Sequence, residues 1–455
     1  MYKKTIFIFR RSLRLEDNAG LVAALKASER VLPVFIFTPE QVVKNQYKSD
    51  NAVQFMAESL QDLDNDLKKR GSKLFYFFGT QSDIVKKLIE NYAFNAVFVN
   101  QDYTPYAKKR DKKIARVCKK HDVAFHSYED LLLYPVGSVL TGSGTPFKKY
   151  TPYYQKAKRA KILLPTKNRY KNYVSKNTRI TNQCKKNIKH FYKKNENASV
   201  AGGRKQGALI LKRIKQFKQY DKKRNLLLYK TTQLSAYIKF GCVSIREVYH
   251  AIAKSINSKD LIKQLYWRDF YYNVAYFYPH VFGCAMKEKY DTIVWPNKKL
   301  FFEKWKKGQT GFPIVDACMR ELNATGFMHN RGRLVTSSFL IKILLVDWRK
   351  GEKYFAQKLI DYDPCVNNGN WQWSASTGAD SQPYFRIFNP WSQSKKFDNL
   401  CEYIKKWVPE LKKVKNSDVH RWAEKYVQYK EIDYPKPIVN YSSMRKKALA
   451  LYRRL

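Results

Sequence analysis

Residues 1–133 alternate between short apolar runs and longer segments whose apolar positions recur every three or four residues. The apolar runs, rich in β-branched and aromatic residues, cover 5–9, 31–37, 73–78, 95–99 and 123–127. The helical patterns between them cover 19–28, 52–70, 82–92 and 106–120. Because strands that alternate with helices form parallel, doubly wound sheets, we expect an α/β domain over residues 1–133.

The periodic pattern is lost between residues 134 and 201. Residues 141–146 are rich in turn formers, and residues 165–199 are rich in lysine and asparagine. Such composition is typical of irregular surface segments, so we interpret 134–201 as an interdomain connector.

From residue 202 onward the pattern is helical, and strand signals are nearly absent. Apolar positions are spaced three to four apart over 205–220, and Ser258 opens a helix predicted over 259–278. Pro313 starts a helix that should end by Gly326, and residues 334–347 have the composition of a buried helix. We therefore expect an all-α domain over residues 202–455.

One polar stretch, residues 361–374, stands out in this domain. It reads Asp-Tyr-Asp-Pro-Cys-Val-Asn-Asn-Gly-Asn-Trp-Gln-Trp-Ser. Pro364 and the Asn367-Asn368-Gly369 run favour a turn over one continuous helix. Polar groups beside large aromatics suit the wall of a deep pocket, although two packing tryptophans at the edge of a core are the simpler interpretation of Trp371 and Trp373 alone.

The charge of the chain indicates a polyanionic partner. Among 455 residues, 87 Lys and Arg outnumber 38 Asp and Glu, which gives a formal net charge of +49. An excess of this size favours nucleic acid over a membrane as the partner, while a general lysine bias of the source proteome is the alternative.

Cysteine usage and apolar runs indicate the compartment. The seven cysteines are odd in number and include no Cys-x-x-Cys, so we expect neither a disulfide framework nor a metal site, and a reducing environment. The apolar run 5–9 is ended by Arg10 and Arg11, and the run 339–346 contains Lys342. Since neither run is a signal peptide or a membrane span, we expect a soluble, cytoplasmic protein without membrane contact.

Four residues of the 259–278 helix carry candidate chemistry. Gln264, Trp267, Arg268 and Tyr271 fall at i, i+3, i+4 and i+7, on one face. There the indole would stack on a nucleobase, the amide would bond the base edge, and the arginine would meet a phosphate. A half-buried helix face with a satisfied arginine is an equally good interpretation of these residues in isolation.

Seven motifs link the chain to a known family. They are Phe9-Arg-Arg-Ser-Leu-Arg-Leu-Glu-Asp-Asn18, Thr231-Thr-Gln-Leu-Ser235, Leu265-Tyr-Trp-Arg-Asp-Phe270, Gly311-Phe-Pro-Ile-Val-Asp-Ala-Cys-Met-Arg320, Met328-His-Asn-Arg-Gly-Arg333, residues 361–374 and Tyr384-Phe-Arg-Ile-Phe-Asn-Pro390. In this order they resemble the DNA photolyase/cryptochrome family over nearly the whole chain. The chain is most similar to class I cyclobutane pyrimidine dimer photolyases.

The resemblance implies an FAD cofactor bound by the helical domain. The cofactor-binding positions that it implies are Tyr220, Thr231, Thr232, Gln233, Leu234, Ser235, Arg333, Asp361, Tyr362, Asp363 and Asn367. Asn367 would face the flavin ring nitrogen that gains a proton on reduction, where a neutral amide can donate or accept. Arg333 and Asp361 are our candidate internal ion pair, and a plain helix cap is the alternative for the hydroxyl cluster at 231–235.

The resemblance also implies an electron relay and a DNA-binding face. Trp371, Trp348 and Trp295 match the relay, although packing alone would account for any single tryptophan. Trp267 and Trp373 would enclose a flipped-out pyrimidine dimer, and Asn367 and Gln264 would act on the flavin and the lesion. The implied DNA-binding positions are Arg224, Gln264, Trp267, Arg268, Tyr271, Asn330, Arg331, Trp373 and Arg386.

The resemblance thus favours a monomeric deoxyribodipyrimidine photo-lyase that acts on UV-damaged DNA, with an electron supplied by light-excited reduced FAD. A second, antenna chromophore of folate or deazaflavin type would bind the N-terminal domain, with Asn45 and residues 100–106 as candidate contacts. One alternative is a (6-4) photolyase, favoured by Gln264 in place of the expected Glu, but that branch should carry two histidines where this chain has Asn330 and Leu334. A cryptochrome without repair activity and a basic nucleic-acid-binding module without catalysis are the others.

Overall fold

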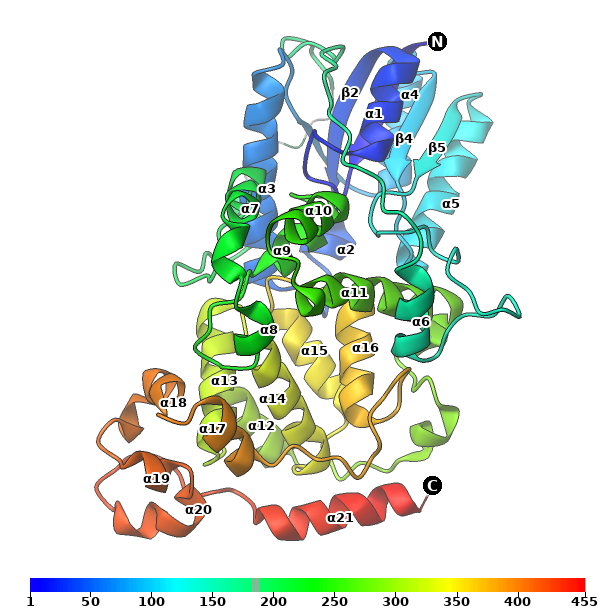
Figure 1. Ribbon diagram of the computed structural model, residues 1–455. Coiled ribbons are helices and arrows are strands. Elements are labelled where there is room, and N and C mark those ends of the chain that lie inside the picture. Colours follow the sequence, from blue (N-terminus) through cyan, green and yellow to red (C-terminus); the bar gives the residue numbers. More distant parts are fainter. Residues whose placement is uncertain (182–183, 185–187, 455) are drawn as a thin grey trace.

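The computed structural model of the protein describes residues 1–181, 184 and 188–454. Its N-terminal part is a five-stranded parallel sheet with strand order β3-β2-β1-β4-β5 (Figure 1). The strands are β1 (Tyr2–Phe9), β2 (Ser28–Phe37), β3 (Phe75–Phe78), β4 (Ala96–Asn100) and β5 (Ala124–Tyr128). The predicted sheet is confirmed, and each strand lies within a few residues of its predicted position.

Helices cover both faces of this sheet. They are α1 (Ala19–Ala27), α2 (Pro39–Val42), α3 (Asp50–Lys68), α4 (Gln81–Asn91) and α5 (Pro105–Lys120). Phe7 and Phe9 face the core shared with α1 and α3, whereas Ile6 and Ile8 face the core shared with α4 and α5. Successive side chains of a strand point to opposite faces, so a strand buried on both sides has the continuous apolar run seen in the sequence.

The connector is more ordered than its composition predicts. It contains α6 (Tyr150–Ala157) and the 3-10 turn η1 (Ile188–Phe191), while 182–183 and 185–187 lie outside the described residues. Tyr173 bridges to Val31 of β2, and Tyr150 stacks on Trp267 of the helical domain with ring centroids 3.7 Å apart. The segment therefore packs against both domains.

The part of the chain described beyond residue 202 contains helices and no strand, as predicted. The α-helices are α7 (Arg204–Lys212), α8 (Tyr220–Lys223), α9 (Leu234–Lys239), α10 (Ile245–Ser255), α11 (Lys259–Phe277), α12 (Lys299–Lys307), α13 (Pro313–Thr325), α14 (Asn330–Lys342), α15 (Trp348–Lys358), α16 (Pro364–Ala375), α17 (Pro390–Phe397), α18 (Glu402–Trp407), α19 (Asn416–Val419), α20 (Trp422–Lys425) and α21 (Tyr441–Arg453). The 3-10 turns are η2 (Ile214–Phe217), η3 (Pro279–Val281), η4 (Glu288–Thr292), η5 (Pro409–Leu411) and η6 (Tyr426–Gln428). In Figure 1, α11 lies between the sheet domain and the bundle α13–α16, and α21 runs along the far end.

Two helix predictions are wrong in extent. The helix expected over 205–220 is divided into α7, η2 and α8. The helix expected over 334–347 begins at Asn330 and ends at Lys342, and Leu345 has a φ of +54° before α15 starts. Ile343, Leu344 and Val346 are as buried as the helix itself, so the apolar run reflects burial of a loop rather than helical structure.

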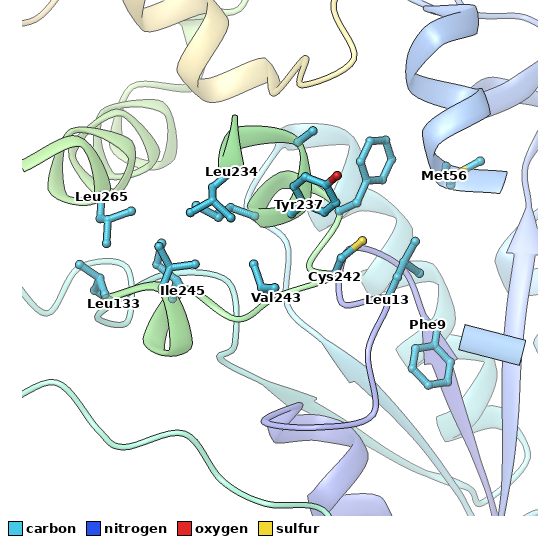
Figure 2. Packing of buried hydrophobic residues seen from close by; sticks show 14 of the residues in the cluster. Phe9, Leu13, Met56, Leu133, Leu234, Tyr237, Cys242, Val243, Ile245 and Leu265 are labelled. Carbon is cyan, nitrogen blue, oxygen red and sulfur yellow. The ribbon is translucent and has the colours of Figure 1, made fainter. Parts of the chain in front are cut away.

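The two domains share one hydrophobic core. Phe9, Leu13 and Met56 of the sheet domain lie in the same cluster as Tyr237 and Ile245 of the helical domain (Figure 2). The boundaries at 133 and 202 that the sequence predicts therefore separate patterns of secondary structure, and apolar packing continues across them. Across the described ranges, none of the helices has both the length and the hydropathy needed to cross a membrane.

Candidate functional site

The stretch 361–374 is largely one helix, α16, and the turn predicted at Asn367-Asn368-Gly369 is wrong. Pro364 is the first residue of the helix, and Asp363 caps it through the backbone N–H groups of Cys365 and Val366. A Cβ on Gly369 would lie 2.2 Å from Cδ1 of Tyr271 in α11. The glycine thus allows α11 and α16 to pack closely, and this tertiary contact outweighs the local turn preference of Asn-Gly.

Asn367 is held in one orientation by Glu352 of α15. Its Nδ2 donates to the backbone oxygen of Glu352 at 3.1 Å and to Oε1 at 3.2 Å. Burial raises the pKa of Glu352 to about 7, although the bond from Asn367 lowers it. No described residue donates to Oδ1 of Asn367, so the amide presents an acceptor, which fits a reduced flavin that carries a proton on its ring nitrogen.

The carboxylates before α16 have different partners. Asp361 accepts from Nη2 of Arg333 at 3.0 Å, which confirms the predicted ion pair. Oδ1 of Asp363 accepts two backbone N–H groups, and Oδ2 accepts from Arg11 and from the hydroxyl of Tyr272. Since both carboxylate oxygens already accept hydrogen bonds, a contact from Asp363 to a cofactor would have to come from its backbone.

The hydroxyl cluster 231–235 forms the start of α9. Thr232 Oγ1 accepts from the backbone N–H of Leu234 at 3.4 Å, and Gln233 has a φ of +51°. Thr231 is half-buried and Ser235 is exposed. Gln233 is the N-cap residue of α9 and its side chain makes no capping bond, so Thr232 forms a local turn contact rather than the plain cap, and the hydroxyls of Thr231 and Ser235 remain available.

Two tyrosines of the expected cofactor set are also placed. Tyr220, in α8, is buried, and burial raises its pKa to about 12. Tyr362 stacks on Tyr47 with ring centroids 6.3 Å apart. Tyr47 belongs to the sheet domain, so that domain contacts the segment that leads into α16.

The candidate relay tryptophans lie in a second hydrophobic cluster inside the helical domain. Trp371, Trp348 and Trp295 are each at most 8% exposed. Trp371 meets Trp305 edge-on at 6.3 Å, and a Cβ on Gly351 would lie 2.3 Å from its ring. Trp305 is missing from the residues predicted from the sequence, because no motif contains it and only its place on the apolar side of an amphipathic helix indicated burial.

The predicted face of α11 is only partly open to solvent. Gln264 and Trp267 are half-buried, and the Trp267 ring lies against Tyr150. Tyr271 is 3% exposed. Nη1 of Arg268 donates to the carbonyl oxygen of Leu131 at 2.7 Å, and the side chain is 10% exposed. The expectation that Arg268 meets a phosphate is therefore withdrawn, because this side chain turns toward Leu131 of the sheet domain instead of the solvent.

The remaining DNA-binding candidates lie nearer the surface. Asn330 and Arg386 are exposed, Trp373 is half-buried, and Arg224 pairs with Asp260 at 3.0 Å. Arg331 donates to Asn225 at 2.7 Å and lies 4.3 Å from the Phe397 ring centre.

Arg331 and Arg386 differ from the buried arginines in their partners. Within the described ranges neither has a carboxylate within ion-pair distance, so their positive charge is not compensated by the protein. Burial and the neighbouring Arg224 lower the pKa of Arg331. An anion is the expected partner for each of these two arginines.

The fold and these placements define a two-domain protein with a helical flavin-binding half, and comparison with known proteins identifies the family. The family model for DNA photolyase matches residues 5–169, and the model for the FAD-binding domain of DNA photolyase matches residues 261–454. The chain belongs to the DNA photolyase family.

Individual relatives agree with this assignment. The chain is 36% identical to a deoxyribodipyrimidine photo-lyase of Alkalihalophilus pseudofirmus, over 98% of this chain and 97% of the relative, and 34% identical to that of Escherichia coli over 98% and 97%. Among solved structures it is similar to a Sulfolobus tokodaii photolyase with two FAD molecules, at 40% identity and a TM-score of 0.89, over 99% of this chain and all of that one. It is also similar to a Synechocystis cryptochrome, at 26% identity and a TM-score of 0.90, over 99% of both chains.

Proposed function

We propose that this protein repairs cyclobutane pyrimidine dimers in DNA by light-driven electron transfer. The main support for this proposal is α16, a single helix that contains Asn367, Trp371 and Trp373. By the family resemblance, these residues would serve the flavin, the electron relay and the lesion, respectively. When bound, FAD in its reduced, light-excited form would supply the electron that opens the dimer.

The protein's own residues orient the cofactor and stabilise charge. Glu352 orients the amide of Asn367, whose oxygen would accept a hydrogen bond from the protonated ring nitrogen of a reduced flavin. Arg333 and Asp361 form a pair beside the start of α16, and their charges offset each other. Preorganised dipoles of this kind need no reorganisation at the moment of reaction.

The lesion pocket would be formed by Trp267, Trp373 and Gln264. Extrusion of a base costs a few kcal/mol, less at a damaged site, and stacking on an indole at about 1–3 kcal/mol per base offsets much of it. Tyr150 backs Trp267 and keeps its ring in one plane. Gln264 can donate to a base oxygen without releasing a proton.

A second chromophore in the sheet domain is the remaining part of the proposal. The Sulfolobus relative carries two FAD molecules, so a second flavin joins the folate and deazaflavin types as a candidate. Asn100, which the sequence offered as a contact, is unsuitable. Its amide is buried and bonds to Ser12, Asn18 and the N–H of Gly20.

The test is blue-light repair of oligonucleotides that carry a thymine dimer or a (6-4) photoproduct. We expect the dimer to disappear under light with reduced FAD, and no repair in the dark. Repair of the (6-4) lesion alone would overturn the lesion assignment, and a flavin band without repair of either lesion would indicate a cryptochrome.

A further inference from the structure

We propose that Arg11 is a positioning residue that acts across the domain junction. From the sheet domain it holds the first turn of α16, and through this helix it sets the positions of Asn367, Trp371 and Trp373. The inference rests on the proposed function, which assigns roles to those three side chains.

The link from Arg11 to α16 is the carboxylate of Asp363. One of its oxygens accepts the N–H groups of Cys365 at 3.1 Å and Val366 at 3.3 Å, which is the helix cap itself. The other oxygen accepts from Nη2 of Arg11 and, at 2.5 Å, from the hydroxyl of Tyr272. Any displacement of the carboxylate by its Arg11 partner therefore acts directly on the first turn of the helix.

Arg11 is itself fixed by groups from separate parts of the chain. Its Nε donates to the carbonyl oxygen of Lys239 at 3.3 Å, Nη1 lies 3.6 Å from Asp102, and the guanidinium lies 5.7 Å from the Tyr272 ring centre. Burial alone would lower the pKa of Arg11, but Tyr272, Asp363 and Asp102 raise it well above its ordinary value. The residue stays charged at every relevant pH and forms a rigid bridge.

The same contact stabilises the ionised cap. Burial alone would raise the pKa of Asp363, but Arg11 and Arg268 lower it below its ordinary value. An ionised carboxylate is the stronger acceptor for the backbone N–H groups at a helix start, where the helix dipole also favours negative charge. Arg11 thus maintains both the position and the charge of the cap.

A second ion network at the junction provides a matched control. Arg246 of α10 pairs with Asp17 at 2.9 Å and with Asp130 at 2.8 Å, and so also joins the two domains. Its hydrogen-bond partners among the described residues are Asp17 and Asp130, and neither belongs to α16. Loss of Arg246 should weaken the junction as a whole without a specific effect on the first turn of α16.

The first experiment measures hydrogen exchange in the full-length protein, and its result does not depend on flavin chemistry. In Arg11→Gln we expect amide exchange over 365–370 to rise about tenfold or more, the ratio that loss of one charge-assisted hydrogen bond implies. Arg11→Lys, which keeps the charge, should recover part of the protection. Arg246→Gln should raise exchange in this segment no more than in the neighbouring segments. Equal exchange in the wild type and Arg11→Gln, or the same pattern in Arg11→Gln and Arg246→Gln, would overturn the proposal.

The second experiment follows photoreduction of bound oxidised flavin in the same variants. We expect Arg11→Gln to slow it about tenfold relative to Arg246→Gln, because a displacement of about 1 Å can cost up to 10²-fold in rate. Raised exchange with wild-type photoreduction would overturn the proposal, since the first turn would then move without displacing Trp371. A wild-type protein that binds no flavin would instead refute the proposed function and leave the exchange result intact.

Discussion

The interior of the molecule and the open face of its helical domain use arginine and tryptophan in opposite ways. Inside, Arg14 and Arg246 both bond Asp130, and Trp371 packs edge-on against Phe355 with ring centroids 4.9 Å apart. On the open face, Arg386 has no carboxylate partner among the described residues, and Trp373 is half-buried.

The difference shows that residue type alone does not assign a role. A buried arginine that is paired with a carboxylate holds structural elements together, whereas an exposed arginine without a carboxylate partner can bind an anion. Arg268 illustrates the point, because its place on the predicted helix face favours phosphate contact while its largely buried side chain donates from Nη1 to a backbone carbonyl instead.

The largest effect is expected inside, at Trp371. Trp371→Phe should abolish photoreduction of oxidised flavin yet spare repair by protein that was reduced chemically, because relay and repair use different electrons. Flash photolysis and repair assays on the same preparation measure the two. Trp305→Phe is the control, since this indole also contacts Trp371. An undiminished rate in the Trp371 variant would remove that residue from the relay.

The ion network at Asp130 should dominate the electrostatic contribution to stability. Asp130→Asn leaves the buried Arg14 without a carboxylate among the described residues, whereas Arg246 keeps Asp17, and removal of one partner of a buried pair costs about 3–5 kcal/mol. Denaturant unfolding measures the loss. Asp260→Asn breaks the partly exposed pair with Arg224 and should cost less than about 1 kcal/mol. Similar losses of unfolding free energy in both variants would contradict the distinction between paired arginines in the interior and arginines on the open face.

On the open face, Gln264→Glu should raise the repair yield. A protonated Glu can donate a stronger bond to the pyrimidine anion than an amide can, a difference of about 1–2 kcal/mol. The quantum yield on a thymine dimer compares the two proteins. An unchanged or lower yield in the Glu variant would show that Gln264 does not limit repair.

Arg331 and Arg386 should contribute to affinity for DNA through charge. Substitution of either by Gln should reduce the slope of log affinity against log salt by roughly 1, because each neutralised phosphate contributes about 0.9. Arg268→Gln is the matched interior control and should leave the slope unchanged. A constant slope in the Arg331 and Arg386 variants would assign both to internal contacts.

Glu352 should make the stability of the protein depend on pH. Burial raises its folded-state pKa to about 7, from an ordinary value of 4.5. The folded state then binds more protons than the unfolded state between these values, so its contribution to stability is present below pH 4.5 and is lost as pH rises toward 7. Glu352→Gln should flatten this part of the stability curve, measured by denaturant unfolding at several pH values. An unaltered curve would place the titration elsewhere.

Much of the fold was predictable because it rests on local periodicity. The strand runs and the helices of the sheet domain follow from residues that are neighbours in sequence, and Ser258 marks the start of α11 correctly. The Arg333–Asp361 pair was found through its motifs. Apolar spacing failed at 343–346, where a buried loop has the same composition as a buried helix.

The sequence by itself determined which groups the site contains: the amide, the indoles, the paired carboxylates and an excess of positive charge. Only the tertiary structure decided which of these groups have no partner within the protein and can contact a ligand. Position 369 needs glycine because the Tyr271 ring occupies the place of a Cβ, and both oxygens of Asp363 accept hydrogen bonds because Arg11 reaches it from 352 positions away in the chain. Local propensity reflects a few neighbouring residues, whereas burial and the choice of hydrogen-bond partners depend on contacts between distant residues. Burial and partners therefore cannot be obtained from local propensity.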